Sequence, residues 1–328
     1  MRNHHEPAAR LRPGMLIAGR WAVGDVLGRG KHAVVYRAAH ADERYRVALK
    51  LFEPDCVSPR EEQLAARARF EHEAKVARRV RHPNVVRVLE VGTSEDGAPF
   101  LVEEIVEGES LEQRLERELL TVPQVFDLAR QSLAGLEGLA AEGIVHRDLR
   151  PANVMLGTHE LGGVAVKLCD LGLARDADDP PDDVRHASEN VLGSPKYLAP
   201  EQVRSFGVDA RCDLYALGAV MYEALAGRAP VRGSHPDEIL ASILSDEPLP
   251  LQSERADCPL ELESLISKAL AKRPEDRFPS ASEMAGALRD LARALSVPSG
   301  MVAWKAPGVR RRDGRSARAV VGILRAER

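Results

Sequence analysis

The stretch His146-Arg147-Asp148-Leu149-Arg150-Pro151-Ala152-Asn153 places an acid, two arginines and an amide in one short segment. It follows an apolar pattern of helical length and precedes the strand-like run Val154-Met155-Leu156, so we expect a loop between two rigid elements, where catalytic groups commonly lie. Asp148 could accept a proton there, and Asn153 could bind a hard cation through its amide oxygen. Aspartate and asparagine are also ordinary turn residues, so neighbouring motifs must decide between the two interpretations.

The composition indicates a soluble cytoplasmic protein. Its 328 residues, 44% of them hydrophobic, can bury a sizeable core and suffice for about two domains or lobes. Charges of mixed sign sum to −4, which provides no global attraction for nucleic acid. The N-terminus lacks a signal-peptide core, and no window is apolar for long enough to form a membrane helix. The four cysteines lack metal or redox spacing, which favours reduced thiols: Cys56, Cys169, Cys212 and Cys258.

Two strand-like runs near the N-terminus flank a glycine-rich segment. Residues 21–27 alternate as a strand does, residues 34–38 form the second run, and Gly28-Arg29-Gly30-Lys31-His32-Ala33 lies between them. Glycines between two strands predict a hairpin that folds over phosphates, whereas a dinucleotide-binding motif would open a helix. Because Ala33 replaces the third glycine of the phosphate pattern, an ordinary hairpin turn is the competing interpretation.

The next run adds a candidate phosphate ligand and its partner. Val47-Ala48-Leu49-Lys50 matches a strand pattern that places a lysine on the α- and β-phosphates of a nucleotide. A helix is predicted to begin near residue 59, where Ser58-Pro59-Arg60-Glu61 offers an N-cap, a first-turn proline and a capping-box glutamate. On that helix Glu73 lies beside the apolar face and could meet Lys50; a solvated helix charge is the alternative. Runs 85–91 and 99–106 complete a small sheet.

Taken in order, these motifs resemble those of a eukaryotic-type protein kinase domain, most closely the bacterial serine/threonine kinases of that class. The resemblance covers roughly residues 20–295. It implies the two-lobed α+β fold of a protein kinase domain, with a lobe over 20–106 that has a five-stranded antiparallel sheet and one helix, and a mainly helical lobe over 107–296. The composition of the flanks indicates a polar lead-in over residues 1–19 and a basic, flexible tail over 297–328. The motifs that carry it are the glycine loop, Val47 to Lys50, Glu73, His146 to Asn153, Asp170-Leu171-Gly172, Gly193 to Glu201, Asp213 and Arg277.

The resemblance implies an ATP-dependent kinase that phosphorylates serine and threonine in proteins, uses Mg²⁺ or Mn²⁺, and autophosphorylates as a homodimer. In such an enzyme Asp148 accepts or orients the substrate hydroxyl, and Asn153 and Asp170 hold the metal. Lys50, itself held by Glu73, positions the α- and β-phosphates. The other nucleotide contacts that it implies are Leu27, Gly28, Arg29, Gly30, Val35, Ala48, Glu104, Val106, Ser110 and Leu156.

Three residues depart from the usual family pattern. Arg150 replaces a lysine that contacts the transferring phosphate, which keeps the charge but not its point-like geometry. Leu171 replaces a phenylalanine and preserves an apolar contact. Glu103 falls at the gatekeeper position beside the adenine pocket, where an unpaired buried carboxylate costs several kcal/mol. Three outcomes are open for Glu103. It pairs with a cation such as Lys50, for which it would compete with Glu73, it is protonated, or a local shift turns it to solvent.

Residues 173–197 correspond to the activation segment of the family. This segment is acidic, and its hydroxyl-bearing side chains, apart from the tyrosine at its end, are Ser188 and Ser194. Arg147 is the usual phosphate receiver, so we expect phosphorylated Ser188 to order the segment through Arg147. By family position, Ser194 is expected to contact Asp148 and the incoming substrate.

The C-terminal half has a helical pattern. Helices are predicted from Thr121 to Gly143, over 208–226 before Gly227, over 261–271 and over 280–295. By family position Asp213 anchors the backbone of the catalytic loop, and Arg277 pairs with Glu201. Beyond Val297 basic residues predominate; that tail could bind an acidic partner or nucleic acid, but a solvated tail is the expectation and nucleic acid is not an expected partner.

Two other functional classes fit part of the pattern. A pseudokinase that binds nucleotide or acts as a scaffold is favoured only by Glu103, since Lys50, Asp148, Asn153 and Asp170 are all present. A small-molecule kinase of the aminoglycoside-phosphotransferase type would share the N-terminal lobe but lack the segment over 193–201. The sequence therefore predicts a protein kinase.

Overall fold

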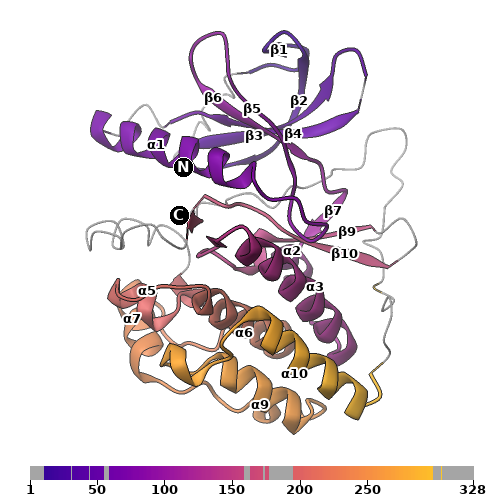
Figure 1. Ribbon diagram of the computed structural model, residues 1–328, viewed down its shortest axis with the longest axis vertical. Coiled ribbons are helices and arrows are strands. Elements are labelled where there is room, and N and C mark those ends of the chain that lie inside the picture. Colours follow the sequence, from indigo (N-terminus) through magenta and orange to yellow (C-terminus); the bar gives the residue numbers. More distant parts are fainter. Residues whose placement is uncertain are drawn as a thin grey trace, which may run out of the picture.

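The computed structural model describes residues 11–30, 32–43, 45–54, 59–158, 163–172, 174–176, 195–297 and 304. An upper lobe contains a β-sheet with one long helix, and a lower lobe is mainly helical (Figure 1). The two-lobed α+β fold expected from the sequence is confirmed.

The sheet of the upper lobe has six antiparallel strands in the order β1-β2-β3-β4-β6-β5, rather than the five expected. The additional strand comes from residues 1–19, the range expected as a lead-in. It is only two residues long, too short for a recognisable alternation, yet Ile17 pairs with Trp21 and is buried. The strands are β1 Leu16–Ile17, β2 Trp21–Arg29, β3 Ala33–His40, β4 Arg46–Phe52, β5 Val88–Thr93 and β6 Pro99–Glu104.

The register of this sheet positions the predicted nucleotide contacts. Strands β2 and β3 form a hairpin closed by a hydrogen bond from the Gly30 amide to the Ala33 carbonyl, 2.8 Å long, so the glycine-rich segment lies at its tip as predicted. Strand β4 runs between β3 and β6, with Lys50 opposite Val35 and Ala48 opposite Glu103. The phosphate lysine and the gatekeeper residue therefore lie close together in adjacent strands.

Helix α1 (Arg60–Ala77) packs on the sheet through its apolar face. Phe70 and Ala74 are buried, and the Phe70 ring meets Phe52 of β4 edge to face at 5.7 Å. Pro59 is the N-cap residue, and the predicted cap Ser58 lies outside the described residues. This packing turns Glu73 into the core, so it is not a solvated helix charge.

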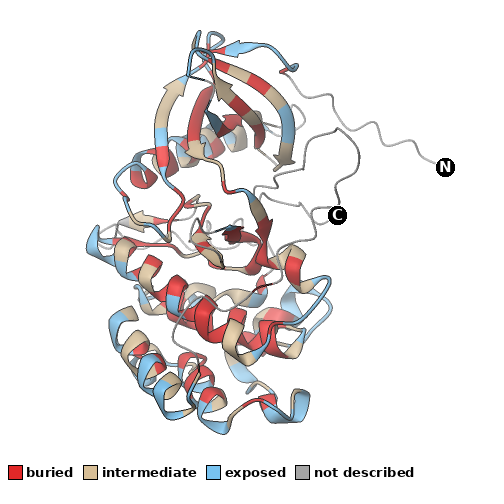
Figure 2. Ribbon diagram, turned by 90° about the vertical axis from the view of Figure 1, so that its right-hand side faces the viewer, coloured by how far each residue is buried: buried red, intermediate tan, exposed pale blue. Residues whose placement is uncertain are grey.

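The lower lobe is built around two buried helices, α3 (Val122–Ala141) and α6 (Arg211–Ala226), both of which the sequence predicted. Helix α6 begins at Arg211 rather than near residue 208 and ends at Gly227, whose φ of +76° suits glycine. Buried residues run along these central helices and the inner strands of the sheet (Figure 2). The other helices are α2 Leu111–Leu115, α5 Pro200–Arg204, α7 Pro236–Ser245, α8 Leu251–Glu254, α9 Leu260–Ala269 and α10 Ala281–Ala294.

A small sheet at the junction of the lobes carries the residues that flank the catalytic loop. Its strands β7 (Gly108–Ser110), β9 (Val154–Thr158) and β10 (Val164–Leu168) lie in the order β10-β9-β7. At Gly108 a Cβ would lie 1.9 Å from the Leu156 carbonyl oxygen, so only glycine permits this close pairing. Strand β8 (Ile144–Val145), before the loop, pairs with β11 (Arg175–Asp176).

None of the helices in the described ranges has the length and apolar character needed to cross a bilayer.

Candidate active site

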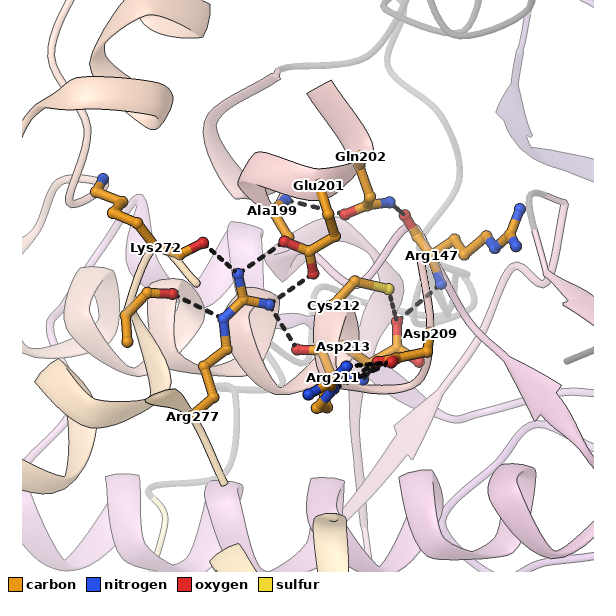
Figure 3. A network of polar contacts seen from close by, with 11 residues as sticks. Arg147, Ala199, Glu201, Gln202, Asp209, Arg211, Cys212, Asp213, Lys272 and Arg277 are labelled. Carbon is orange, nitrogen blue, oxygen red and sulfur yellow. Dashed lines mark hydrogen bonds and ion pairs between the residues drawn. The ribbon is translucent and has the colours of Figure 1, made fainter. Parts of the chain in front are cut away.

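The loop between β8 and β9 is held from below by α6. Asp213, buried in the first turn of α6, accepts hydrogen bonds from the backbone amides of His146 and Arg147, each 2.8 Å long. Figure 3 shows the bond from Arg147. Gln202 of α5 donates to the Arg147 carbonyl at 2.8 Å. Arg147 has a φ of +66°, a conformation that costs energy for a non-glycine residue and persists only where the surroundings enforce it. These three bonds supply that restraint, and the predicted role of Asp213 agrees with this geometry.

Asp148 and Asn153 contact each other across the loop. The Asn153 side-chain amide donates to the Asp148 carbonyl at 2.8 Å and to its carboxylate at 2.9 Å. Burial raises the pKa of Asp148 to about 6, although Arg150 opposes the shift. At neutral pH the carboxylate is therefore mostly ionised and can accept a proton. Because the Asn153 amide donates to Asp148, its oxygen is the atom left to face a cation.

A buried ion-pair cluster joins three elements of the two lobes. Nζ of Lys50, from β4, lies 2.6 Å from Oε1 of Glu73 in α1 and 3.1 Å from Oδ1 of Asp170, which follows β10. Burial disfavours the charge on Lys50, but Asp170 and Glu73 outweigh burial and raise its pKa above the ordinary range. Burial alone would raise the pKa of Asp170, but Lys50 holds it below its ordinary value, so Asp170 is a carboxylate. The predicted Lys50–Glu73 contact is present.

The donor set around the loop fits a hard metal ion that is shared with phosphates. Asp170 offers an ionised carboxylate and Asn153 an amide oxygen, the oxygen ligands that Mg²⁺ prefers. Within the described part of the chain, no group of three or more His, Cys, Asp or Glu side chains is placed to hold a metal. Two protein donors suit Mg²⁺ bound partly by substrate phosphates and water rather than a dedicated protein cage.

Glu103 lies in the ungapped register expected for the gatekeeper position, but it does not capture Lys50. In the described residues, the ion pairs of Lys50 go to Glu73 and Asp170, and no hydrogen bond or ion pair joins Lys50 to Glu103. Burial raises the pKa of Glu103 to about 8, although Lys50 opposes this. Of the alternatives expected for Glu103, the pairing with Lys50 is not formed; the residue is partly exposed, and its raised pKa favours the protonated form at neutral pH.

Replacing Glu103 with glutamine is expected to stabilise the protein at pH 8 and to change stability little at pH 5. The pKa of Glu103 rises from 4.5 to about 8 on folding, so the folded protein binds the extra proton between these values and stability falls as pH rises through this window. Because the Glu103 side chain is partly exposed, solvent screening reduces the effect, and the free energy of unfolding should rise by about 1–3 kcal/mol in Glu103→Gln at pH 8.

Denaturant unfolding of both proteins at pH 5 and pH 8 measures this difference. Glu104→Gln is the matched control in the same strand: its carboxylate accepts from Lys167 Nζ at 2.7 Å and the Arg87 amide at 2.9 Å, so no stabilisation is expected. A Glu103→Gln gain of equal size at the two pH values would contradict the raised pKa.

The other predicted nucleotide contacts come from both lobes. Val35, Ala48, Val106 and Leu156 are buried, and Leu27, Gly28, Arg29 and Gly30 of the hairpin are partly exposed. Ser110 is buried as the N-cap of α2, where its hydroxyl accepts from the Gln113 amide at 3.2 Å. Arg150 is partly buried, with Nη2 lying 3.9 Å from Oε1 of Glu112. Their roles in binding nucleotide stay predictions.

The predicted regulatory hydroxyls, those of Ser188 and Ser194, lie outside the described residues. Arg147, their expected partner, is described, and its backbone is fixed as shown above. Phosphorylation of Ser188 and its contact with Arg147 remain predictions.

Sequence reasoning missed one buried contact in the range expected as a flexible tail. Trp304 is 6% exposed and donates its indole N–H to Oδ2 of Asp127 in α3 at 3.3 Å. A lone tryptophan among basic residues was the only signal for this anchor. Sequence alone does not show which buried acceptor would receive its N–H.

Comparison with known proteins gives consistent similarities. A model of the protein kinase domain matches residues 21–287. The serine/threonine-protein kinase pkn2 of Myxococcus xanthus is 37% identical over 288 residues, which cover 86% of this chain and 34% of that protein. Pkn3 of the same organism is 35% identical over 272 residues, 82% of this chain and 49% of that protein. PknB of Mycobacterium leprae is 33% identical over 272 residues, which cover 82% of this chain and 42% of that protein. The chain thus spans less than half the length of each of these relatives.

Proposed function

This chain belongs to the protein kinase family, and we propose that it transfers the γ-phosphate of ATP to serine and threonine hydroxyls of proteins, including its own. The observation that carries the proposal is the Lys50 cluster, in which one ammonium group lies 2.6 Å from Glu73 and 3.1 Å from Asp170. Through this cluster, residues of the upper sheet, of α1 and of the segment after β10 form one site. The similar proteins named serine/threonine-protein kinase support the choice of acceptor.

The roles of the residues follow from the demands of phosphoryl transfer, which are positioning and charge neutralisation. Lys50 would bind the α- and β-phosphates while Glu73 holds its ammonium group in place. Asp148, ionised at neutral pH, would orient the acceptor hydroxyl and take its proton. Asn153 and Asp170 would hold Mg²⁺ or Mn²⁺, which supplies positive charge to the phosphates when it is bound.

The gatekeeper carboxylate does not turn the site into that of a pseudokinase. The Glu73 partner of Lys50 is in place, and a protonated Glu103 adds no negative charge beside the phosphates. The segment that docks peptide substrates includes Glu201, which is anchored by Arg277. That anchor favours protein substrates over small molecules.

We place the activity in the cytoplasm, where ATP is abundant and thiols stay reduced. Among the described residues, Cys169, Cys212 and Cys258 are buried and form no disulfide, which agrees with that compartment. We infer that autophosphorylation takes place between two copies of the chain, so a transient homodimer is part of the proposal. The net charge of −4 offers nothing that favours nucleic acid as a partner.

The direct test is transfer of labelled γ-phosphate from ATP with Mg²⁺ to the chain itself and to a generic basic protein, followed by acid hydrolysis to identify the labelled amino acid. We expect phosphoserine or phosphothreonine with the wild type and none with Asp170→Asn. Label on neither substrate, with the wild type or with Glu103→Met, would overturn the proposal. Label only with Glu103→Met would show that the gatekeeper carboxylate blocks the site.

A further inference from the structure

Trp304 occupies a slot between two helices of the lower lobe. Its indole N–H donates to Asp127 of α3 at 3.3 Å, and the Arg114 guanidinium of α2 lies 5.9 Å from its ring centroid. Both of these charged residues are nearly fully buried, Arg114 at 2% and Asp127 at 4% exposure. Trp304 therefore contacts one buried cation and one buried anion, each of which also has an ion-pair partner: Glu109 for Arg114 and Arg130 for Asp127.

On the α2 side, the buried arginine holds one edge of the small sheet. Nε of Arg114 donates to Oε1 of Glu109 at 2.7 Å. Glu109 belongs to β7 and lies opposite Leu156 of β9, one of the expected nucleotide contacts. A change in the position of Arg114 would therefore reach the strand that carries Leu156 through a single ion pair.

On the α3 side, the carboxylate of Asp127 connects Trp304 to the other edge strand of that sheet, β10. Oδ2 of Asp127 also accepts from Nε2 of Gln131 at 3.2 Å. Gln131 in turn binds the backbone of β10, donating to the Val164 carbonyl at 3.0 Å and accepting from the Val166 amide at 2.9 Å. Strand β10 ends just before Asp170, the candidate metal ligand.

The two paths converge on one three-stranded sheet, in which β9 lies between β7 and β10 and begins directly after Asn153. We propose that Trp304 is a positioning residue for the nucleotide site: by bridging α2 and α3 it clamps both edge strands and so fixes Asn153, Leu156 and Asp170. This inference rests on the proposed function, because it assumes that a nucleotide binds at those residues.

The physical basis is the loss of one contact by each of two buried charges that keep their ion-pair partners, Asp127 with Arg130 at 2.6 Å and Arg114 with Glu109 at 2.7 Å. Without the indole ring, Asp127 loses a donor, and the buried Arg114–Glu109 pair loses the ring that covers it. A buried polar group that loses a hydrogen bond or its cover shifts toward its remaining partners or takes up water. Either response loosens the contacts to β7 and β10. By linkage, whatever free energy Trp304 docking contributes to nucleotide binding, nucleotide binding contributes equally to Trp304 docking.

The test compares nucleotide affinity in full-length variants, using a non-hydrolysable ATP analogue with Mg²⁺ and calorimetry well below the melting temperature. Trp304→Ala is expected to raise the Kd about fivefold or more, and Trp304→Phe, which keeps a ring but not the N–H, should fall between it and the wild type. Met284→Ala, a buried change in α10 that removes no hydrogen bond, should lower the melting temperature but leave the Kd unchanged.

The outcomes separate this inference from the proposed function. If the wild type does not bind the analogue, the proposed function fails. If the wild type binds it and Trp304→Ala binds equally well, the clamp is refuted even if that variant melts earlier. Equal rises in Kd for Trp304→Ala and Met284→Ala would also refute it, since general destabilisation would explain both.

Linkage gives a second test, because nucleotide binding should in turn favour the docked state of Trp304. A tryptophan with only a structural role would show no such response. The chain has two tryptophans, so Trp21→Phe leaves Trp304 as the only indole fluorophore. Saturating analogue and Mg²⁺ should reduce quenching of Trp304 by acrylamide, because the bound nucleotide favours the docked state. Unchanged quenching on saturation would contradict the coupling.

Discussion

Asp148→Asn is expected to lower the rate of phosphoryl transfer by about 10²–10⁴-fold while nucleotide affinity stays nearly unchanged. The substitution removes the carboxylate that accepts the hydroxyl proton but keeps the size and shape of the side chain. The backbone carbonyl of residue 148, which accepts from Asn153 at 2.8 Å, is untouched, so the loop should keep its conformation. The loss should therefore appear in kcat rather than in nucleotide binding.

Steady-state transfer of labelled phosphate gives kcat, and titration with the ATP analogue gives the affinity. Asp290→Asn is the matched control, because this aspartate lies on the outer face of α10 with 77% of its side chain exposed and should leave both quantities unchanged. A fall of less than tenfold for Asp148→Asn would assign the proton transfer to another group. A large rise in Kd would instead show that the substitution disturbs the nucleotide site.

The groups that the sequence located best are those fixed by short local patterns. Lys50 is set by its strand motif, and Glu73 by its position on an amphipathic helix, so a correct secondary structure brings the two together. The role of Asp213 came from the family resemblance rather than from its helix pattern, and its partners are the backbone amides of His146 and Arg147. The order of the motifs along the chain was enough to predict these contacts, because each contact joins only two elements.

Features that depend on packing over long sequence distances were not predictable. Strand β1 is defined by its pairing with β2 rather than by its own two residues. Protonation was one of the outcomes expected for Glu103, but choosing among them depends on the burial of its carboxylate and on the partners of Lys50, neither of which a motif encodes. Trp304 finds its acceptor in Asp127, far earlier in the chain, so only the assembled lobe creates its slot.

Arg277→Ala is expected to lower the free energy of unfolding by about 3–5 kcal/mol. The Arg277 side chain is fully buried, and its hydrogen bonds to the Glu201 carboxylate are 2.6 and 2.7 Å long (Figure 3). Its other N–H groups donate to the carbonyls of Ala271, Arg211 and Lys272 at 2.7, 3.1 and 3.2 Å. Removing the guanidinium leaves a buried carboxylate and these carbonyls without their donor.

Denaturant unfolding at neutral pH measures this loss, and Arg273→Ala is the matched control a few residues earlier in the chain. Arg273 also pairs with a carboxylate, that of Glu275, but 71% of its side chain is exposed, so its replacement should cost less than about 1 kcal/mol. Similar losses for the two variants would show that burial does not set the strength of these pairs. Arg277→Lys should lose most of the same stability, because three ammonium donors cannot replace five in a planar fork.

A double-mutant cycle can separate the ion pair from the carbonyl contacts of Arg277. Glu201→Leu alone leaves the buried guanidinium without its anion, and Arg277→Met alone leaves the carboxylate without its cation, so each single change creates an uncompensated buried charge. The double variant contains neither charge and should cost clearly less than the sum of the single changes. Additive losses would instead attribute the stability to the three carbonyl hydrogen bonds. In that case Arg277 would stabilise the lobe through the carbonyls of Ala271, Arg211 and Lys272 rather than through its pairing with Glu201 of α5.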